Sequence, residues 1–444
     1  MKKFFKNIYL ERRFFIVLSS LVLGFLISYM MPDILGALEL LFFIFVLIFL
    51  VDIILVFASK GSINAERQVP EKLSNGDENE IGINILNSYL FPVGVKILDE
   101  IPHQFQKRDF GIDTNLGKGK EKRFKYYLRP TERGVYSFGN LNIFARSPIG
   151  LISKKHTFDN ARQVPVYPSF LQLRKYDLMA FTNRLFEYGL KKIRRIGHTM
   201  EFEQIKDYVQ GDDIRNINWK ATAKKGQLMV NQFQDEKSQP IYSVIDKGRV
   251  MKMPFNGLSL LDYAINATLV ISHIAIKKHD KAGMFAFSRK IENRVVAERR
   301  SSQMNLILET LYNLETNFEE SDYSRLYADI KRNINHRSLI LLYSNFETLD
   351  ALQRQLPYLQ AIAKQHLLVV IFFENTELIR FVDEKAETVH QIFEKTIAEK
   401  FVYEKKLIVN ELRKYGIQTI LTKPENLTIN TINKYLEIKA RGLI

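Results

Sequence analysis

Two long apolar stretches near the start of the chain place the strongest constraint on its fold. Residues 14–31 are almost wholly apolar, and residues 34–57 are apolar apart from Glu39 and Asp52. Each stretch is long enough to cross a hydrocarbon layer of about 30 Å as a helix. Neither looks like a cleaved signal peptide, which has a shorter apolar region and a small-residue cleavage site. We therefore predict a two-helix transmembrane hairpin over residues 1–60.

The charges that flank this hairpin predict its orientation. The turn at residues 31–33 carries no basic residue, whereas basic residues stand on both outer flanks: Lys2, Lys3, Lys6, Arg12 and Arg13 before it, and Lys60, Arg67 and Lys72 after it. By the positive-inside rule, both termini and the rest of the chain lie in the cytoplasm, so we expect a protein of the cytoplasmic membrane. Asp52 is either a functional group within the span or a carboxylate that reaches the nearby interface, and Glu39 has the same two readings.

The length, the cysteine content and the net charge limit the kinds of protein that the remaining chain can be. A length of 444 residues predicts two or three domains. The absence of cysteine excludes disulfides and thiolate chemistry. A formal charge of +15 suggests an anionic partner, which could be nucleic acid, an acidic protein or the anionic face of a membrane.

Two different periodicities follow the hairpin. Residues 61–169 alternate apolar and polar side chains between turn signals such as Asn75-Gly76, which predicts an antiparallel β-sandwich. Residues 170–239 form a polar connecting segment without a clear pattern.

Residues 240–444 alternate apolar strands with helices. The predicted strands are 241–246, 282–287, 338–344, 367–373 and 418–421, and the predicted helices are 258–278, 304–314, 323–334, 348–364, 389–415 and 426–441. Continuous apolar strands separated by helices are typical of a parallel sheet covered on both faces. The expected fold class is therefore a doubly wound α/β domain beside an all-β domain and a membrane hairpin.

No motif predicts catalysis. Residues 111–119 (GIDTNLGKG) differ from a phosphate-binding loop in glycine spacing and lie within the β region. The closest histidines, His273 and His279, lack the spacing that brings two ligands to one helix face. A basic run at Lys191, Lys192, Arg194 and Arg195 suits ion pairs or an anionic leaflet better than nucleic acid, for which no fold signature is visible. We expect a protein that is not an enzyme and does not bind nucleic acid.

The polar segment carries the most specific pattern in the chain. It reads MEFEQIKDYVQGDDIRNINWKATAKKGQLMVNQFQDE over residues 200–236. The pattern consists of Glu201, Tyr208, Gly211, Asp212, Arg215, Trp219 and Lys220. With Asp246 downstream, it closely resembles the family called domain of unknown function 58. The Arg133-Gly134-Val135-Tyr136 turn and the run from Ser147 to Leu151 resemble that family too, although Ser147 stands where the family more often has Asp.

This resemblance implies a fold and a context without a reaction. The family is similar to von Willebrand factor A domains in its C-terminal half, which implies a Rossmann-like sheet with a metal-ion-dependent adhesion site at the strand ends. Its members are linked with MoxR-type AAA+ ATPases and are thought to assemble or regulate other proteins at membranes. The resemblance thus implies protein partners, including such an ATPase, and no established enzymatic activity.

The metal site implied by the resemblance lacks ligands here. Asp246 matches the first position, but Gly248 and Val250 stand where serines would supply oxygens, and Asn345 stands where a carboxylate is expected. Magnesium needs near-octahedral oxygen ligands. Lys247 and Arg249 would add repulsion of about 5 kcal/mol at an effective dielectric near 20. We expect a degenerate site without magnesium, with its second loop near residues 321–323 and with Asp246 paired to Lys247, Arg249 or an upstream basic residue.

Two roles stay open for the motif around Trp219. Arg215 and Asp212 could form a buried fork beside the indole that locks the polar segment onto the sheet. Alternatively, these residues form a surface for a partner. As a whole, the sequence predicts a membrane-anchored, non-enzymatic adaptor. The alternatives are a magnesium-dependent adhesion module and a membrane-tethered nucleic-acid binder.

Overall fold

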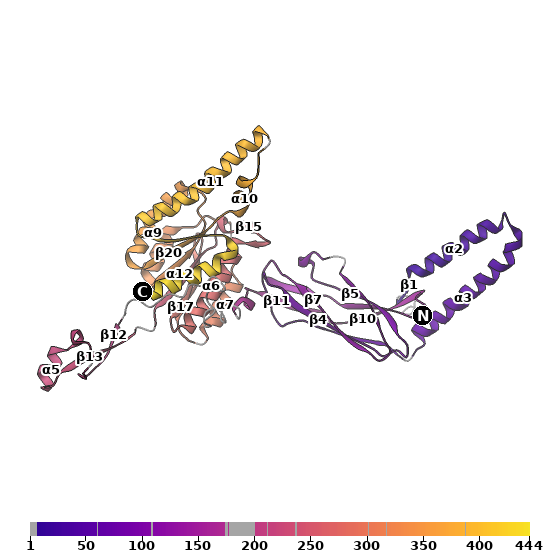
Figure 1. Ribbon diagram of the computed structural model, residues 1–444, viewed down its shortest axis with the longest axis horizontal. Helices are drawn as coiled ribbons and strands as arrows, with labels where there is room; N and C mark the ends of the chain where they lie inside the picture. The colour runs from indigo at the N-terminus through magenta and orange to yellow at the C-terminus, as the bar shows by residue number, and fades with distance from the viewer. Residues whose placement is uncertain are drawn as a thin grey trace. The chain divides into compact units, whose positions relative to one another are not determined.

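The computed structural model describes residues 7–59, 61–107, 110–173, 176, 200–210, 212–235, 238–300, 302–316, 318–386 and 388–444. The chain divides into two compact units (Figure 1), the first ending at Tyr167 and the second beginning at Pro168. Each unit has its own hydrophobic core. The basic run at residues 191–195 and Gly211 lie outside the described residues.

Two apolar helices, α2 (Arg12–Ser28) and α3 (Leu35–Phe57), form an antiparallel hairpin in the first unit. Phe14 packs on Phe45 and Phe49, with ring centroids 5.5 and 5.1 Å apart. Most other side chains of α3 are exposed. Among the described residues, α3 and α6 (Leu260–Lys277) are long and apolar enough to cross a membrane, but α6 is buried within the second unit.

The rest of the first unit is β-structure around one core. One sheet has five strands in the order β1-β10-β9-β5-β6, and two three-stranded sheets have the orders β3-β11-β8 and β2-β4-β7. The strands are β1 (Ile8–Leu10), β2 (Ile63–Gln68), β3 (Leu73–Ser74), β4 (Asn79–Asn87), β5 (Val93–Asp99), β6 (Gly111–Leu116), β7 (Glu121–Leu128), β8 (Gly134–Phe138), β9 (Leu141–Arg146), β10 (Ile152–Phe158) and β11 (Arg162–Tyr167). Alternate residues such as Ile81, Ile83 and Ile85 fill the core, as the period of two predicts.

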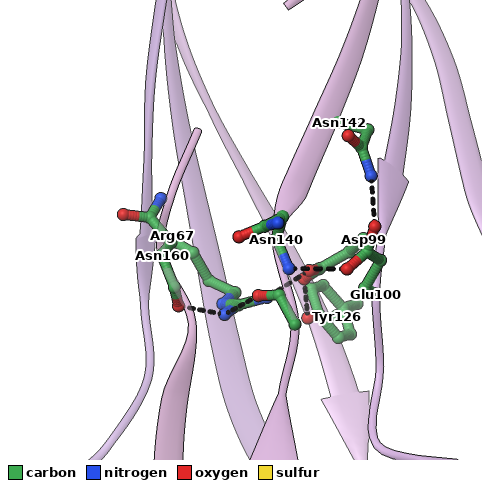
Figure 2. Close-up of polar contacts among 8 residues, drawn as sticks. Arg67, Asp99, Glu100, Tyr126, Asn140, Asn142 and Asn160 are labelled. Carbon is green, nitrogen blue, oxygen red and sulfur yellow. Dashed lines mark hydrogen bonds and ion pairs between the residues drawn. The ribbon is translucent and has the colours of Figure 1, made fainter. Parts of the chain in front are cut away.

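A buried ion pair joins two of these sheets (Figure 2). Arg67 of β2 donates to the carboxylate of Asp99 at the end of β5, and Tyr126 of β7 donates to the other oxygen of that carboxylate. The second guanidinium nitrogen of Arg67 donates to the backbone oxygens of Gly139, at 2.8 Å, and Asn160. Burial and the neighbouring Asp99 raise the pKa of Tyr126. Every charge in this network therefore has a partner, which offsets the cost of burying it.

The second unit contains a six-stranded sheet in the order β18-β17-β14-β19-β20-β21. The strands are β14 (Pro240–Asp246), β17 (Lys281–Phe287), β18 (Ile291–Glu298), β19 (Leu339–Tyr343), β20 (Leu367–Phe373) and β21 (Gln418–Thr422). Only the edge strand β18 runs antiparallel to its neighbour. In sequence order this arrangement reads 3-2-1-4-5-6, which is the doubly wound order with its switch point between β14 and β19.

Helices cover both faces of this sheet. The core on one face is built with α6, α7 (Gln303–Tyr312) and α12 (Leu427–Ala440). The core on the other face is built with α8 (Tyr323–Asn333), α9 (Leu349–Gln365) and α11 (Val389–Lys414). Alternate strand residues point into the two cores: Ile245 packs in the core with α6, and Val244 packs in the core with α8. The mixed α/β fold and the β-rich domain expected from the sequence are therefore present.

Three elements of the second unit were not expected. Strand β18 and helix α10 (Thr376–Asp383) extend the α/β domain. The polar segment folds into a hairpin of β12 (Met200–Asp207) and β13 (Met229–Asp235), with helix α5 (Trp219–Lys225) between the strands. We call residues 200–235 the hairpin module.

Candidate functional site

The carboxyl ends of β14 and β19 meet at the switch point and bring Asp246 beside Ser344. Asp246 is only 1% exposed. One of its carboxylate oxygens accepts from the backbone N–H of Gly248, at 2.8 Å, and from the hydroxyl of Ser321. The other accepts from the hydroxyls of Ser344, at 2.7 Å, and Tyr323, at 3.4 Å. We call Asp246, Ser321, Tyr323 and Ser344 the hydroxyl cage.

Burial dominates the electrostatics of this cage. Desolvation raises the pKa of Asp246, while the hydrogen bonds from Ser321, Ser344 and Gly248 act in the opposite direction. Burial and the nearby carboxylate also raise the pKa of Tyr323, so its hydroxyl stays a donor. Gly248 is required here, because an added Cβ would lie 2.3 Å from the hydroxyl oxygen of Ser321.

The prediction that Asp246 pairs with Lys247, Arg249 or an upstream basic residue is wrong. Lys247 donates instead to Glu292, and Arg249 lies 4.0 Å from Glu320. Hydroxyl groups bind the carboxylate of Asp246 instead, because the loop at 321–323 and the end of β19 lie directly against it. The loop at 321–323 therefore lies beside Asp246, as the sequence predicted for the second loop of the site.

The other expected ligand positions also differ. Asn345 does not supply the third-loop oxygen, since its side-chain oxygen accepts from the ammonium of Lys405 at 2.6 Å. Ser344, one residue earlier, takes that place. Gly248 offers a backbone N–H, and Val250 packs against the core. Within the described ranges, no three His, Asp or Glu side chains gather as metal ligands. One carboxylate among hydroxyls is a poor match for magnesium, and loss of metal binding stays a prediction.

A cavity of about 610 Å³ opens at the same edge of the sheet, beyond β19, β20 and β21. Its lining is mainly apolar and comes from the strand ends, α10 and α11: Phe255, Phe373, Leu378, Phe401, Val402 and Leu421. Lys405 also lines it and donates to the backbone oxygen of Phe346 as well as to Asn345. Burial lowers the pKa of Lys405 to about 8, against the opposing effect of Glu347. The cavity thus combines an apolar wall with one partly desolvated amine.

An exposed apolar stripe on α11 leads to this cavity. Val389, Phe393, Ile397 and Phe401 follow one another at four-residue spacing, so they share one helix face. All four are exposed, and Phe401 also lines the cavity. Neither the stripe nor the cavity was predicted from the sequence, although the four-residue spacing of these apolar side chains was a visible signal.

The hairpin module holds the residues of the motif. Its helix α5 is fixed by Asn218, whose side chain accepts from the backbone N–H of Ala221 at 3.0 Å and donates to Asn231 at 2.8 Å. Gly226 ends the helix in a left-handed conformation with φ 72°, which favours glycine. Thr222 accepts from the N–H of Met229 at 3.0 Å. These contacts attach α5 to β13 without using the indole of Trp219.

The motif residues do not form the buried fork considered above. Trp219 is 69% exposed, and the Arg215 side chain, 89% exposed, pairs with Asp213 rather than Asp212. Asp212 accepts from the backbone N–H of Val209 and from Lys206, both at 3.0 Å, and these contacts lower its pKa. The locking role is therefore wrong, because neither the guanidinium nor the indole is buried.

The remaining motif residues lie around these. Tyr208 is half-buried, Lys220 is exposed, and Glu201 lies on β12. The exposed side chains of the module include four further large apolar ones, Ile205, Val209, Ile214 and Leu228. Large exposed apolar side chains beside arginine are typical of surfaces that bind other proteins.

The geometry defines a class of protein in which a β-rich domain is followed by the hairpin module and a doubly wound α/β domain. Residues 204–390 match the family model "Protein of unknown function DUF58". This match confirms the family resemblance drawn from the motif for that part of the chain. "Uncharacterized protein YeaD" of Bacillus subtilis (strain 168) is 23% identical over 238 residues, which are 52% of this chain and 57% of that relative. The chain thus spans little more than half the length of this curated relative.

Solved structures give low overall similarity. The conserved hypothetical protein BatB from Bacteroides thetaiotaomicron is 11% identical, with a TM-score of 0.29, and the match covers 46% of this chain and 99% of that one. An aerotolerance-related membrane protein from Bacteroides fragilis NCTC 9343 is also 11% identical, with a TM-score of 0.28 and the same coverage. The CARDB domain of the PF1109 protein from Pyrococcus furiosus is 19% identical, with a TM-score of 0.19, and the match covers 25% of this chain and 92% of that one.

Proposed function

We propose that this protein is a membrane-anchored adaptor that acts by binding other proteins rather than by catalysis. The hairpin of α2 and α3 inserts into the cytoplasmic membrane, and the β-structure of the first unit and the whole second unit face the cytoplasm. The basic flanks of the hairpin support this orientation. The exposed, apolar side chains of α3 support insertion.

The exposed Trp219 is the observation that carries the proposal. A tryptophan left 69% exposed contributes only part of its apolar area to folding, whereas at an interface it supplies a large apolar area. The guanidinium of Arg215 is accessible to a partner, since its ion pair with Asp213 is exposed and therefore weak. The partner surface consists of Val209, Ile214, Arg215, Trp219 and Leu228.

The proposed partner is an AAA+ ATPase of the MoxR type, as the family resemblance implies. In this proposal the hairpin module binds the ATPase. The cavity and the exposed stripe of α11 then serve a second protein that the ATPase remodels. The hydroxyl cage holds the carboxyl ends of β14 and β19 together at the switch point of the sheet.

One observation favours magnesium-dependent adhesion as a second candidate. The hydroxyls of Ser321 and Ser344 converge on Asp246, as oxygen ligands around an ion would. Calorimetric titration of the purified protein with magnesium tests this candidate. We expect no heat of binding. Saturable binding that Asp246→Asn abolishes would favour adhesion through the metal.

Partner capture tests the proposal itself. The wild-type chain and the variant Trp219→Ala are expressed in the native host and solubilised under mild conditions, and the co-purified proteins are identified. Loss of one apolar anchor typically costs about 2 kcal/mol or more, which is over tenfold in affinity. Leu90→Ala, an exposed leucine of the first unit, is the matched control. Equal capture of the ATPase by wild type and W219A would contradict the proposed surface.

A further inference from the structure

A cavity of about 570 Å³ lies in the first unit, where the start of α2 approaches the sandwich. Three arginines line it, namely Arg12 and Arg13 from α2 and Arg146 from the end of β9. The lining also includes Glu11, Ser147 and Gly94. We call this cavity the arginine pocket.

Two glycines make room for the arginine side chains. Gly94 of β5 pairs directly with Arg146 across the sheet, and a Cβ there would lie 2.3 Å from the Nε of Arg146. Gly150 has φ 73°, and a Cβ there would lie 3.1 Å from a guanidinium nitrogen of Arg13. That nitrogen donates to the backbone oxygen of Ile149 at 3.1 Å. The backbone around the pocket is thus shaped to hold two guanidinium groups.

The positive charge of the pocket is not balanced by ion pairs. Across the part of the chain that the structure describes, no ion pair joins Arg12, Arg13 or Arg146 to a carboxylate. The lining therefore carries three guanidinium groups against the single carboxylate of Glu11. Guanidinium groups bind phosphate oxygens through paired hydrogen bonds, so a phosphate is the chemistry that this lining recognises.

The position of the pocket identifies the source of that phosphate. Its wall includes Ser147, whose hydroxyl donates to Asp52 near the end of α3, and Arg12 begins α2. The pocket therefore lies where both apolar helices leave their apolar surroundings, which is the level of lipid headgroups. We propose that the arginine pocket binds the phosphate headgroup of an anionic phospholipid. This inference rests on the proposed membrane anchoring and is independent of partner binding.

Lipid retention tests the inference on the full chain. The detergent-purified protein is titrated with phosphatidylglycerol or phosphatidylcholine, and bound lipid is counted by native mass spectrometry. Wild type is expected to bind phosphatidylglycerol about tenfold more tightly than phosphatidylcholine, since charge-assisted hydrogen bonds are the strong ones. The double variant Arg12→Gln/Arg146→Gln is expected to lose this preference. Arg146→Lys keeps the charge without the paired geometry and is expected to retain only part of it.

The controls separate this inference from the proposed function. Lys72→Gln/Lys125→Gln removes two exposed positive charges outside the pocket lining and is expected to leave the preference unchanged. Equal binding of both lipids by wild type, or an unchanged preference in R12Q/R146Q, would overturn the proposal. Displacement of the lipid by about 1 mM inorganic phosphate would assign the pocket to a soluble anion and also overturn it. Anchoring has its own readout: release of the wild type from membranes by alkaline extraction would refute the membrane hairpin and, with it, the lipid source of the phosphate, whereas loss of the lipid preference alone leaves the hairpin standing.

Discussion

The carboxylate of Asp52 in α3 accepts a hydrogen bond from the hydroxyl of Ser147 in the loop between β9 and β10. Its other oxygen accepts from the backbone N–H groups of Leu151, at 2.8 Å, and Ile152, at 3.0 Å. Asp52 is fully buried by these contacts. The sequence left two roles open for Asp52, a functional group within the span or a carboxylate that reaches the interface. The structure shows neither, because this carboxylate fixes the end of α3 to the β-structure of the first unit.

Asp52→Ala is expected to lower the free energy of unfolding of the first unit by about 2–4 kcal/mol, because three buried donors lose their acceptor. Hydrogen exchange measured on the full chain should show faster exchange at the amides of Leu151 and Ile152. Ser147→Asp should destabilise as well, since it places two carboxylates together. The double variant D52S/S147D restores one carboxylate and one hydroxyl, and is expected to recover part of the loss. Wild-type exchange rates in D52A would contradict this role.

The Arg67–Asp99 pair gives a second prediction. Asp99→Ala leaves a buried guanidinium without its charged partner and is expected to cost about 3–5 kcal/mol. Thermal unfolding and hydrogen exchange in β2 and β5 measure this cost. Lys125→Ala breaks an exposed pair with Glu80 and serves as the control, with a much smaller expected loss because solvent screens this pair. Similar losses in the two variants would show that burial does not set the strength of the Arg67–Asp99 pair.

His156 predicts a pH dependence of the first unit. Burial, assisted by the charge of Lys154, lowers the pKa of His156 from 6.5 to about 4. The unfolded chain therefore binds a proton at higher pH than the folded chain does. The free energy of unfolding is therefore unaffected by His156 above about pH 6.5. It falls by about 1–3 kcal/mol as the pH decreases toward 4, because protonation of His156 then favours the unfolded chain. Denaturant titrations from pH 4 to 7 measure it, and His156→Gln should flatten the profile. An unchanged slope in H156Q would exclude His156 as the cause.

Lys405 predicts a reactive amine in the cavity. With a pKa of about 8, its labelling by an acylating reagent should reach half of its limiting rate near pH 8. Because an ordinary lysine has a pKa near 10.4, labelling of Lys405 in the denatured chain should still rise above pH 9. Mass spectrometry of the peptide that contains Lys405 measures both rates. Parallel pH profiles of Lys405 in the folded and the denatured chain would contradict the effect of burial.

The buried strands and their covering helices were predictable because their apolar side chains follow simple periods. Strand β20, for example, was predicted to the residue, since it is apolar along its whole length. Strand β18 was missed because it is an edge strand, and only Val295 and Ala297 of its side chains are buried. The hairpin module was missed for a related reason, since its polar sequence carries no period that marks a buried face.

The candidate site was less predictable, because its geometry depends on contacts between distant segments. The sequence singled out Asp246 and the loop near Ser321, but the hydroxyl of Ser344 lies 98 positions from Asp246 along the chain. The predicted third-loop position, Asn345, is one residue away from Ser344, the residue that contacts Asp246. Likewise, the motif identified Trp219 and Arg215, but composition could not tell a buried fork from an exposed surface.

Site-specific photocrosslinking at Trp219 in native membranes tests the central claim most directly. A photoreactive phenylalanine analogue replaces Trp219 in one chain and Tyr127, an exposed side chain of the first unit, in a control chain. The account predicts a protein adduct at position 219 that contains a AAA+ ATPase, is absent at position 127 and weakens when Arg215→Ala is added. The same adducts at both positions, or none at position 219 while the chain remains in the membrane, would contradict it.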